Sequence, residues 1–254
     1  MLILTGTGVN NRDISQLAIE QIKQADELLL DLYTNHISKE ELSNLSMLCA
    51  KEPKLLSRSD LEENAGQIVE RAKRAKIAIL VSGDPLIATT HHTILDLAAK
   101  AHVEYMVCHS SSIFSAAIGE SGLDIYKFGP TTTITFWSEK YRPVSFIDAI
   151  KKNIDNAQHT LALFDYHYEE QRRMRLGEAI VLLHAADEQR GHGLMDKERM
   201  LLVMGDIGKQ TQQIKYVQLG AVDKEVLKGF EGKTLCMIVP GKLSFAEEDA
   251  LKRF

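Results

Sequence analysis

The first half of the chain alternates short apolar runs with segments of helical periodicity. Residues 77–81 are apolar throughout, as expected of a parallel strand covered on both faces. Between residues 14 and 25, apolar side chains recur at helical spacing, which predicts a helix with one buried face. Because strands that alternate with helices form parallel sheets, this half is predicted to be α/β. Further strands are predicted at residues 1–5, 28–32 and 103–108.

Polar residues mark where several helices are expected to start. Ser38 and Ser59 each stand three residues before a Glu, and Asp13 stands three before Gln16. Each is therefore predicted to open a helix through a capping box. The helix that starts at Ser59 is expected to run to about Arg74. Further helices are predicted at residues 93–101, 145–153 and 175–186.

The pattern changes after residues 129–130. Residues 131–137 are rich in Thr and aromatic side chains, which is typical of a half-buried strand. Strands lie closer together from here on, which favours a mixed, partly antiparallel sheet. We therefore predict two α/β domains, residues 1–125 and 126–254, with the ligand site in a cleft between them. Strands are expected at residues 160–164, 200–204, 213–217 and 234–239.

Composition and charge narrow the class of protein. The apolar share of 44% excludes disorder, and the formal charge of -5 argues against sequence-independent nucleic-acid binding. The 3 cysteines are far apart and form no CxxC, so they indicate neither a disulfide framework nor a zinc site and fit a reducing cytosol. No basic leader begins the chain, and no apolar run approaches the roughly 20 residues that span a bilayer. A soluble intracellular protein is expected.

Two glycine-containing turns follow predicted strands. Gly6-Thr7-Gly8 resembles the start of a dinucleotide fingerprint, but the third glycine is absent, so a tight strand-to-helix turn is favoured. Gly83-Asp84-Pro85 follows the strand at 77–81, and open α/β sheets bind ligands at such strand ends. The Asp84 carboxylate can hold a ligand hydroxyl or cation there, or it can bond its own backbone in an Asx turn. The sequence leaves both interpretations open.

The other polar clusters give weaker indications. His91 and His92 are adjacent and cannot both face one metal ion from a helix, so helix capping by the neighbouring hydroxyls is favoured. Ser110-Ser111-Ser112 lacks the elbow motif of a hydrolase nucleophile and is predicted to present hydroxyls and N–H groups at the next helix start. Arg172-Arg173-Met174-Arg175 follows two glutamates, which favours a solvated helix start over a docking patch for an acidic partner. No metal site is predicted.

The string Gly83-Asp84-Pro85-Leu86-Ile87-Ala88-Thr89-Thr90-His91 resembles the signature loop of the diphthine synthases. These are S-adenosylmethionine-dependent methyltransferases of the tetrapyrrole-methylase-like fold. Other segments agree in the right order along the whole chain, and residues 122–129 are specific to this family. The agreeing segments are 6–8, 31–34, 56–60, 112–116, 122–129, 159–161 and 239–243.

The resemblance implies two α/β domains with S-adenosylmethionine between them, in a cytoplasmic homodimer. It implies repeated methylation of the amino group of 2-(3-amino-3-carboxypropyl)histidine on translation elongation factor 2, with S-adenosylhomocysteine as the second product. No membrane contact and no direct nucleic-acid binding are expected. No catalytic residue is assigned. Carried over by position, the cofactor-binding residues are Val9, Asp84, Ile87, Ser112, Ile113, Phe164, Ile207 and Leu235.

Two positions depart from the family pattern. Gly6-Thr7-Gly8-Val9 stands where the family usually reads Gly-Leu-Gly-Leu, and Ser244 stands where it often has His. No imidazole role is therefore assigned near the C-terminus. Two alternatives stay open: another methylase of this fold that acts on a tetrapyrrole or on ribosomal RNA, and a non-catalytic S-adenosylmethionine-binding module. The acidic charge weighs against RNA, and Tyr126-Lys127-Phe128-Gly129 favours the diphthine branch.

Overall fold

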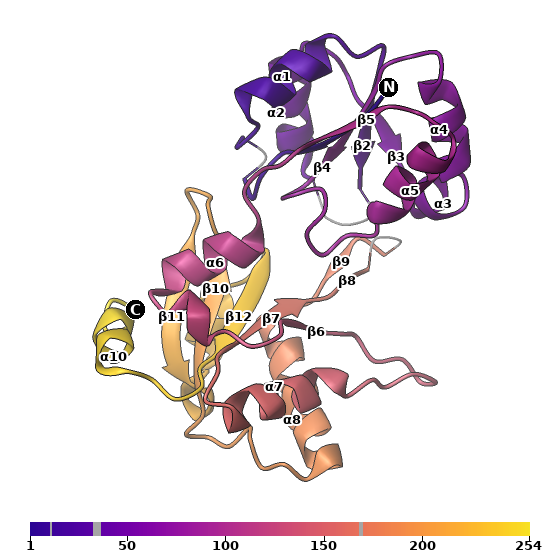
Figure 1. The fold of residues 1–254 in the computed structure, drawn as a ribbon. Coiled ribbons are helices and arrows are strands. Elements are labelled where there is room, and N and C mark those ends of the chain that lie inside the picture. Colours follow the sequence, from indigo (N-terminus) through magenta and orange to yellow (C-terminus); the bar gives the residue numbers. More distant parts are fainter. Residues whose placement is uncertain (11, 33–36, 168–169) are drawn as a thin grey trace. The chain divides into compact units, whose positions relative to one another are not determined.

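The computed structural model describes residues 1–10, 12–32, 37–167 and 170–254, and it divides into two compact units (Figure 1). Residues 1–113 and 170–171 form the first unit, and the other described residues form the second. Helix α6 (Ile113–Ser121) therefore belongs to the second unit from its second residue onward. The predicted domain boundary at 125/126 stays a prediction.

The first unit is built on a five-stranded sheet in which every pairing is parallel, which confirms the predicted α/β fold. Its order is β3-β2-β4-β1-β5, so β1 lies between β4 and β5. The strands β1 and β4 are buried at every position, which explains why their sequences are mainly apolar. The strands are β1 (Leu2–Gly6), β2 (Glu27–Asp31), β3 (Lys54–Leu56), β4 (Ile77–Val81) and β5 (Tyr105–Cys108).

Helices cover both faces of this sheet, because successive strand residues point to opposite sides. Leu2 and Leu4 pack in one buried cluster with side chains of the helices α3 (Arg58–Glu62), α4 (Ala65–Ala72) and α5 (His92–Lys100). Ile3, between them, packs in a second cluster with the helices α1 (Gln16–Lys23) and α2 (Lys39–Cys49). Figure 1 shows the two helix groups on opposite sides of the sheet.

One predicted helix start is confirmed and one is wrong. Ser38 caps α2 through a capping box with Glu41. Ser57, by contrast, caps α3 with Asp60 as its reciprocal partner, so Ser59 lies inside that helix. A short break then separates α3 from α4, and no continuous helix runs towards Arg74.

The predicted capping box at Asp13 is also wrong. Ser15 caps α1 by accepting the N–H of Ala18. The Asp13 carboxylate instead accepts the hydroxyl of Ser111 at 2.6 Å. A contact between residues 98 positions apart therefore replaces the expected local one.

The second unit holds a five-stranded sheet of order β11-β10-β12-β7-β6. Its first three pairings are antiparallel, and β6 is parallel to β7, which confirms the predicted mixed sheet. A separate two-stranded sheet, β8-β9, follows β7. The strands are β6 (Thr132–Ile134), β7 (Thr160–Phe164), β8 (Tyr166–His167), β9 (Arg172–Arg173), β10 (Met200–Gly205), β11 (Gln213–Gln218) and β12 (Leu235–Val239).

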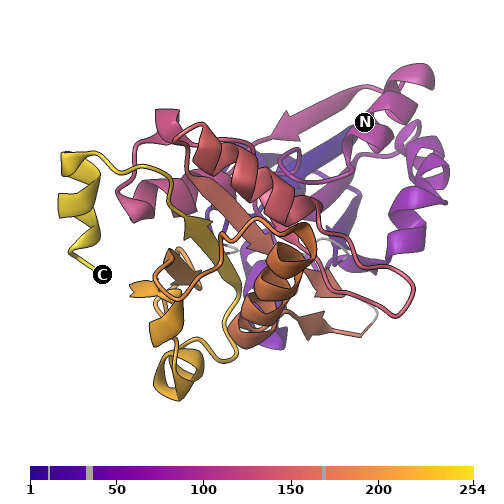
Figure 2. The same cartoon turned by 90° about the horizontal axis from the view of Figure 1, so that it is seen from below.

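Two helices, α7 (Ser145–Asp155) and α8 (Leu176–Arg190), lie side by side in both views (Figures 1 and 2). Phe146 of α7 and Leu183 of α8 pack with Met237 of β12 in the core of this unit. The smaller helical elements are η1 (Ile125–Lys127), η2 (Leu219–Ala221), α9 (Lys224–Gly229) and α10 (Phe245–Leu251). Among the described residues, no helix is both long and apolar enough to cross a membrane.

Candidate functional site

Three loops meet at the carboxyl edge of the first sheet, because β4, β1 and β5 are neighbours that run in parallel. Gly8 and Gly83 exchange backbone hydrogen bonds of 3.2 and 3.1 Å. Both have positive φ, 75° and 72°, which glycine adopts without strain. The Val9 N–H donates to the hydroxyl of Ser111 at 3.1 Å. The loops after β1, β4 and β5 are thus one hydrogen-bonded surface.

Packing explains why β1 ends in glycine. A Cβ on Gly6 would lie 2.4 Å from the carbonyl oxygen of Gly83 and 2.7 Å from Cβ of Ser110. The tight turn favoured for Gly6-Thr7-Gly8 therefore accounts for this residue without a dinucleotide.

Asp84 is buried at the centre of this surface. Its Oδ1 accepts the N–H of Leu86 at 3.0 Å, which is the Asx turn that the sequence left open. Its Oδ2 accepts the N–H of Ser110 at 3.2 Å and lies 2.8 Å from Nδ1 of His109. Since a carboxylate offers about four lone-pair sites, the Asx turn leaves room for a further donor from a ligand.

The remaining first-unit residues predicted to bind the cofactor lie at the same edge. Val9 is half-buried, and Ser112 is buried just before α6. Ile113 is the first residue of α6, so its N–H is among those that a helix leaves free of internal partners. Ile87 is 44% exposed and offers apolar surface at the loop. The structure brings these residues together with Asp84, while their binding roles stay predictions.

Three of the hydroxyls that were predicted to lie at helix starts bind loop groups instead. Ser110 donates its hydroxyl to the carbonyl of Asp13 at 2.5 Å, and Ser111 donates to the Asp13 carboxylate. Thr89 donates to the carbonyl of Pro85 at 2.7 Å, and the N-cap residue of α5, His91, makes no side-chain cap. Ser110, Ser111 and Thr89 therefore bind Asp13 and the Pro85 carbonyl rather than cap the next helix.

His91 is part of the interior of the first unit. Its Nε2 lies 3.3 Å from Oδ2 of Asp31, and both side chains are almost fully buried. Among the residues that the structure describes, no group of three or more His, Cys, Asp or Glu could hold a metal ion.

The three cofactor residues predicted in the second domain also share an edge. Leu235 opens β12 and pairs with Gly205 at the end of β10, and Cys236 pairs with Leu163, next to Phe164. Ile207 lies two residues after the end of β10. Because Leu235 is 8% and Ile207 only 5% exposed, they have mainly backbone atoms to offer a ligand, whereas Phe164 is half-buried.

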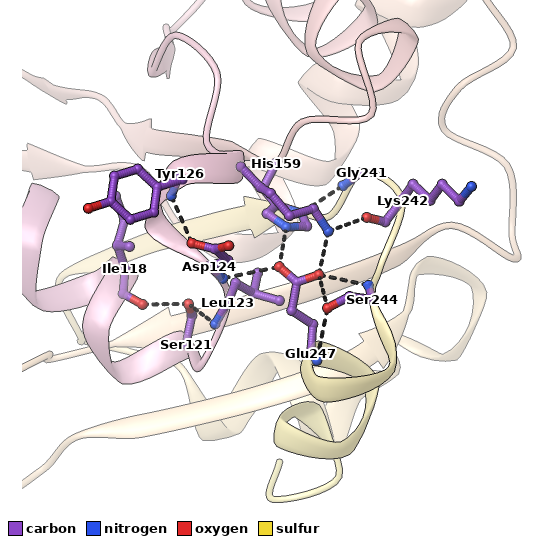
Figure 3. Close-up of polar contacts among 11 residues, drawn as sticks. Ile118, Ser121, Leu123, Asp124, Tyr126, His159, Gly241, Lys242, Ser244 and Glu247 are labelled. Carbon is purple, nitrogen blue, oxygen red and sulfur yellow. Dashed lines mark hydrogen bonds and ion pairs between the residues drawn. The ribbon is translucent and has the colours of Figure 1, made fainter.

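Sequence reasoning did not single out Glu247, a buried carboxylate of α10 in the second unit (Figure 3). It accepts hydrogen bonds from Nζ of Lys127, from Nε2 of His159 at 2.9 Å, and from the N–H of Asp124 at 3.0 Å. Burial raises its pKa, but these donors and Ser244 outweigh burial and hold the pKa of Glu247 well below its ordinary value. Three motif segments, 122–129, 159–161 and 239–243, meet around this carboxylate.

The contacts of His159 fix its tautomer. Its Nδ1 accepts the N–H of Gly241 at 3.0 Å, so Nε2 carries the proton that is donated to Glu247. Burial lowers the pKa of His159, and the hydrogen bond to Glu247 only partly opposes this. His159 is therefore a neutral structural residue.

Ser244, which stands where the family often has His, is explained by the same network. It is the N-cap of α10, and its capping box uses Glu247. The Ser-x-x-Glu spacing could have revealed this helix start, but the long-range donors to Glu247 leave no local signal.

The helix start predicted at the basic cluster is only partly right: Arg172 and Arg173 form β9, Met174 is buried, and Arg175 is the N-cap of α8. Arg172 and Arg175 both pair with Glu178. Burial raises the pKa of Glu178, but hydrogen bonds from Arg175 and Arg172 prevail and lower it to about 2. A cavity of about 660 Å³ beside these side chains is lined by apolar residues such as Phe136 and by lysines of α9. The docking interpretation stays a prediction.

Known proteins resemble the chain over its whole length. The family model for tetrapyrrole (corrin/porphyrin) methylases matches residues 1–223. The diphthine synthase of Methanocaldococcus jannaschii is 33% identical, over 99% of this chain and 98% of that protein. The diphthine synthase of Methanothermobacter thermautotrophicus is 34% identical, over 99% and 94%.

Solved structures agree. A crystal structure of diphthine synthase gives a TM-score of 0.85 at 31% identity, covering 100% of this chain and 95% of that one. A putative diphthine synthase from Entamoeba histolytica gives 0.87 at 31% identity, covering 100% and 98%. These matches confirm the predicted family resemblance, fold class and methyltransferase class. The chain belongs to the tetrapyrrole (corrin/porphyrin) methylase family and, within it, to the diphthine synthases.

Proposed function

We propose that the protein is the methyltransferase of diphthamide biosynthesis. It transfers methyl groups from S-adenosylmethionine to the amino group of 2-(3-amino-3-carboxypropyl)histidine on translation elongation factor 2, and S-adenosylhomocysteine is released. The observation that carries this proposal is the similarity to diphthine synthases over 99% of the chain. The clustering of Val9, Asp84, Ile87, Ser112 and Ile113 at one sheet edge supports it.

The chemistry of this edge fits the cofactor. S-adenosylmethionine combines a charged amino-acid end with a ribose diol and an apolar adenine. Asp84 has acceptor capacity for an ammonium or hydroxyl, the Ile113 N–H is at a helix start, and Ile87 is exposed enough to cover a ring. The glycine turns at Gly8 and Gly83 keep side chains out of the way, so that a ligand can approach the backbone.

Three further cofactor-binding residues are proposed in the second unit. Phe164 would contribute a ring face, and Ile207 and Leu235 would contribute backbone groups, because their side chains are buried. The common sheet edge of these three residues supports a single binding surface in this unit.

The chain's main catalytic contribution is positioning. When bound, the cofactor supplies an electrophilic methyl group on a sulfonium. The protein must hold the acceptor amine in line with the methyl carbon and the sulfur, and such orientation can lower a barrier by about 7–11 kcal/mol. Dry surroundings also favour the neutral, nucleophilic amine.

We further propose a cytoplasmic homodimer. Cys49, Cys108 and Cys236 are free and buried, and burial raises the pKa of Cys236 to about 12. Thiols kept reduced and unreactive fit a reducing compartment. The dimer rests on the family resemblance.

A methylase that acts on a tetrapyrrole or on ribosomal RNA, and a module that only binds the cofactor, are the alternatives. The formal charge of -5 weighs against RNA. Family motifs occur in both units, which weighs against a module that only binds the cofactor.

The test uses the purified full-length protein, S-adenosylmethionine and matched elongation factor 2 that carries the aminocarboxypropyl-histidine precursor. Intact mass of the partner is followed over time, with an unmodified elongation factor as the control. Stepwise methyl-sized gains on the precursor alone support the proposal and count the transfers. Cofactor binding without any gain would reject this substrate.

A further inference from the structure

His109 is held at the proposed cofactor edge by a buried carboxylate. Its Nδ1 lies 2.8 Å from Oδ2 of Asp84; the side chain of His109 is 67% exposed and that of Asp84 only 5%. The other contacts of the Asp84 carboxylate come from the N–H groups of Leu86 and Ser110. Because every such contact makes Asp84 an acceptor, the imidazole must be the donor.

This arrangement selects one tautomer. When Nδ1 carries the proton, the neutral imidazole has its lone pair on Nε2. No hydrogen bond to Nε2 occurs among the residues that the structure describes. The exposed ring therefore presents a proton acceptor at the surface that contains Val9, Ile87 and Ser112.

The loop that carries His109 is held by hydrogen bonds of the two residues that follow it. Ser110 and Ser111 bind Asp13, and the Ser110 N–H binds Asp84. The charged group in contact with His109 is the Asp84 carboxylate. An imidazole oriented by a buried carboxylate is the arrangement by which His–Asp pairs accept protons, since the carboxylate stabilises the imidazolium that forms.

We propose that His109 is the proton acceptor of the methyl transfer and that Asp84 is its positioning residue. This inference rests on the proposed function. A primary amine is mostly protonated at neutral pH, so its lone pair must be freed. Nε2 takes the ammonium proton, and the amine nitrogen then forms a bond to the methyl carbon. The carbon–sulfur bond breaks, and its electron pair stays on sulfur as a neutral thioether. The imidazolium releases its proton to water before the next transfer.

The test separates proton transfer from positioning. In His109→Asn, the amide reaches the place of Nδ1 and can still donate to Asp84, but nothing replaces the Nε2 lone pair. His109→Ala removes both functions. We expect kcat for methylation of elongation factor 2 to fall about 10²–10⁴-fold in both variants. The Kd for S-adenosylmethionine, measured by calorimetry, should stay within about threefold of wild type, a change in binding free energy below about 1.4 kcal/mol.

Two further measurements complete the design. Added imidazole should restore part of the activity of His109→Ala, and NMR of labelled His109 in the cofactor-free protein should show the proton on Nδ1. His102→Asn is the matched control, because His102 is exposed and has a φ of 54°, which Asn adopts readily. This control should keep wild-type kcat.

Several results would overturn the inference. Full activity of His109→Asn, with loss only in His109→Ala, would reduce His109 to a positioning residue. A proton on Nε2 in the NMR experiment would do the same. If wild-type protein methylates the partner and both variants remain active, the inference alone fails. If wild-type protein does not methylate it, the proposed function fails and the inference with it.

Discussion

Glu247 accepts a 2.9 Å hydrogen bond from Nε2 of His159, although the two residues are 88 positions apart in the chain. The same carboxylate completes the capping box of α10 and binds Lys127 and the Asp124 N–H. One acid therefore fixes η1, the start of β7 and the C-terminal helix together (Figure 3). Lys127, His159 and Gly241 belong to the family motifs but are not proposed to bind the cofactor. Their contacts in this network give them a structural role.

Replacing this acid should destabilise the protein. In Glu247→Gln, an amide NH2 would face either Lys127 or the Nε2–H of His159, so donor would meet donor. Removing one partner of a buried ion pair costs about 3–5 kcal/mol, and we expect a loss of this size in the free energy of unfolding by urea. Glu248→Gln, one residue on and exposed, should change stability by less than about 1 kcal/mol. If the two variants were equally stable, the contacts of Glu247 would not contribute to the free energy of unfolding as predicted.

Stability should fall with acid in two steps. Burial lowers the pKa of His159 below its ordinary 6.5, so the unfolded chain takes up this proton first and stability falls as pH drops below about 6.5. The depressed pKa of Glu247 adds stability above the unfolded value of 4.5, which is lost as pH falls below it. Urea unfolding across this pH range measures both steps. In His159→Gln the upper step should shrink, and an unchanged slope would assign that step to other groups.

Gly6 should tolerate no side chain. The Cβ of Gly6→Ala would lie 2.4 Å from the Gly83 carbonyl oxygen, which forces the loops after β1 and β4 apart. We expect a stability loss of about 1–3 kcal/mol, typical of overpacking, and weaker cofactor binding by calorimetry. Gly66→Ala is the control: it lies in α4 with nothing within 4 Å of an added Cβ, and helix propensity should stabilise it by up to about 1 kcal/mol.

Local patterns predicted the buried strands well, because burial produces a recognisable apolar run. β3, which has two exposed residues of three, was not predicted. Residues 77–81 and 160–164 form β4 and β7 with the predicted bounds. The helix starts at Asp13 and Ser59 failed, because local capping signals compete: Ser15 and Ser57 stand nearby, and Asp13 is taken by Ser111 from another loop.

In the candidate site, too, the sequence identified single residues but not the contacts between distant segments. The family resemblance selected Asp84, but not its partner His109, which lies 25 positions away. That pair depends on β4 and β5 flanking β1 in the sheet. The same limit hid Glu247, since its donors come from segments that only the fold brings together.

Asp84→Asn should weaken cofactor binding while the protein stays folded. Asn keeps one carbonyl oxygen for the Leu86 N–H, but its amide group meets the donors from Ser110 and His109. We expect the Kd for S-adenosylmethionine to rise at least about tenfold, or about 1.4 kcal/mol, by calorimetry. Circular dichroism should report an unchanged fold. An unchanged Kd would remove Asp84 from the cofactor site.

Asp165 offers a contrasting test, because it is an acid at the end of β7 whose oxygens serve the backbone. Its Oδ2 accepts the N–H of Phe136 and its Oδ1 the N–H of Tyr166, both at 2.9 Å. In Asp165→Asn one of these bonds survives, so kcat for methylation should stay within about tenfold of wild type. Removal of a general base would lower kcat by about 10²–10⁴-fold. A loss of many thousand-fold with cofactor binding intact would make Asp165 the proton acceptor. His109 would then be excluded from that role, because one amine proton leaves in each transfer and needs only one acceptor.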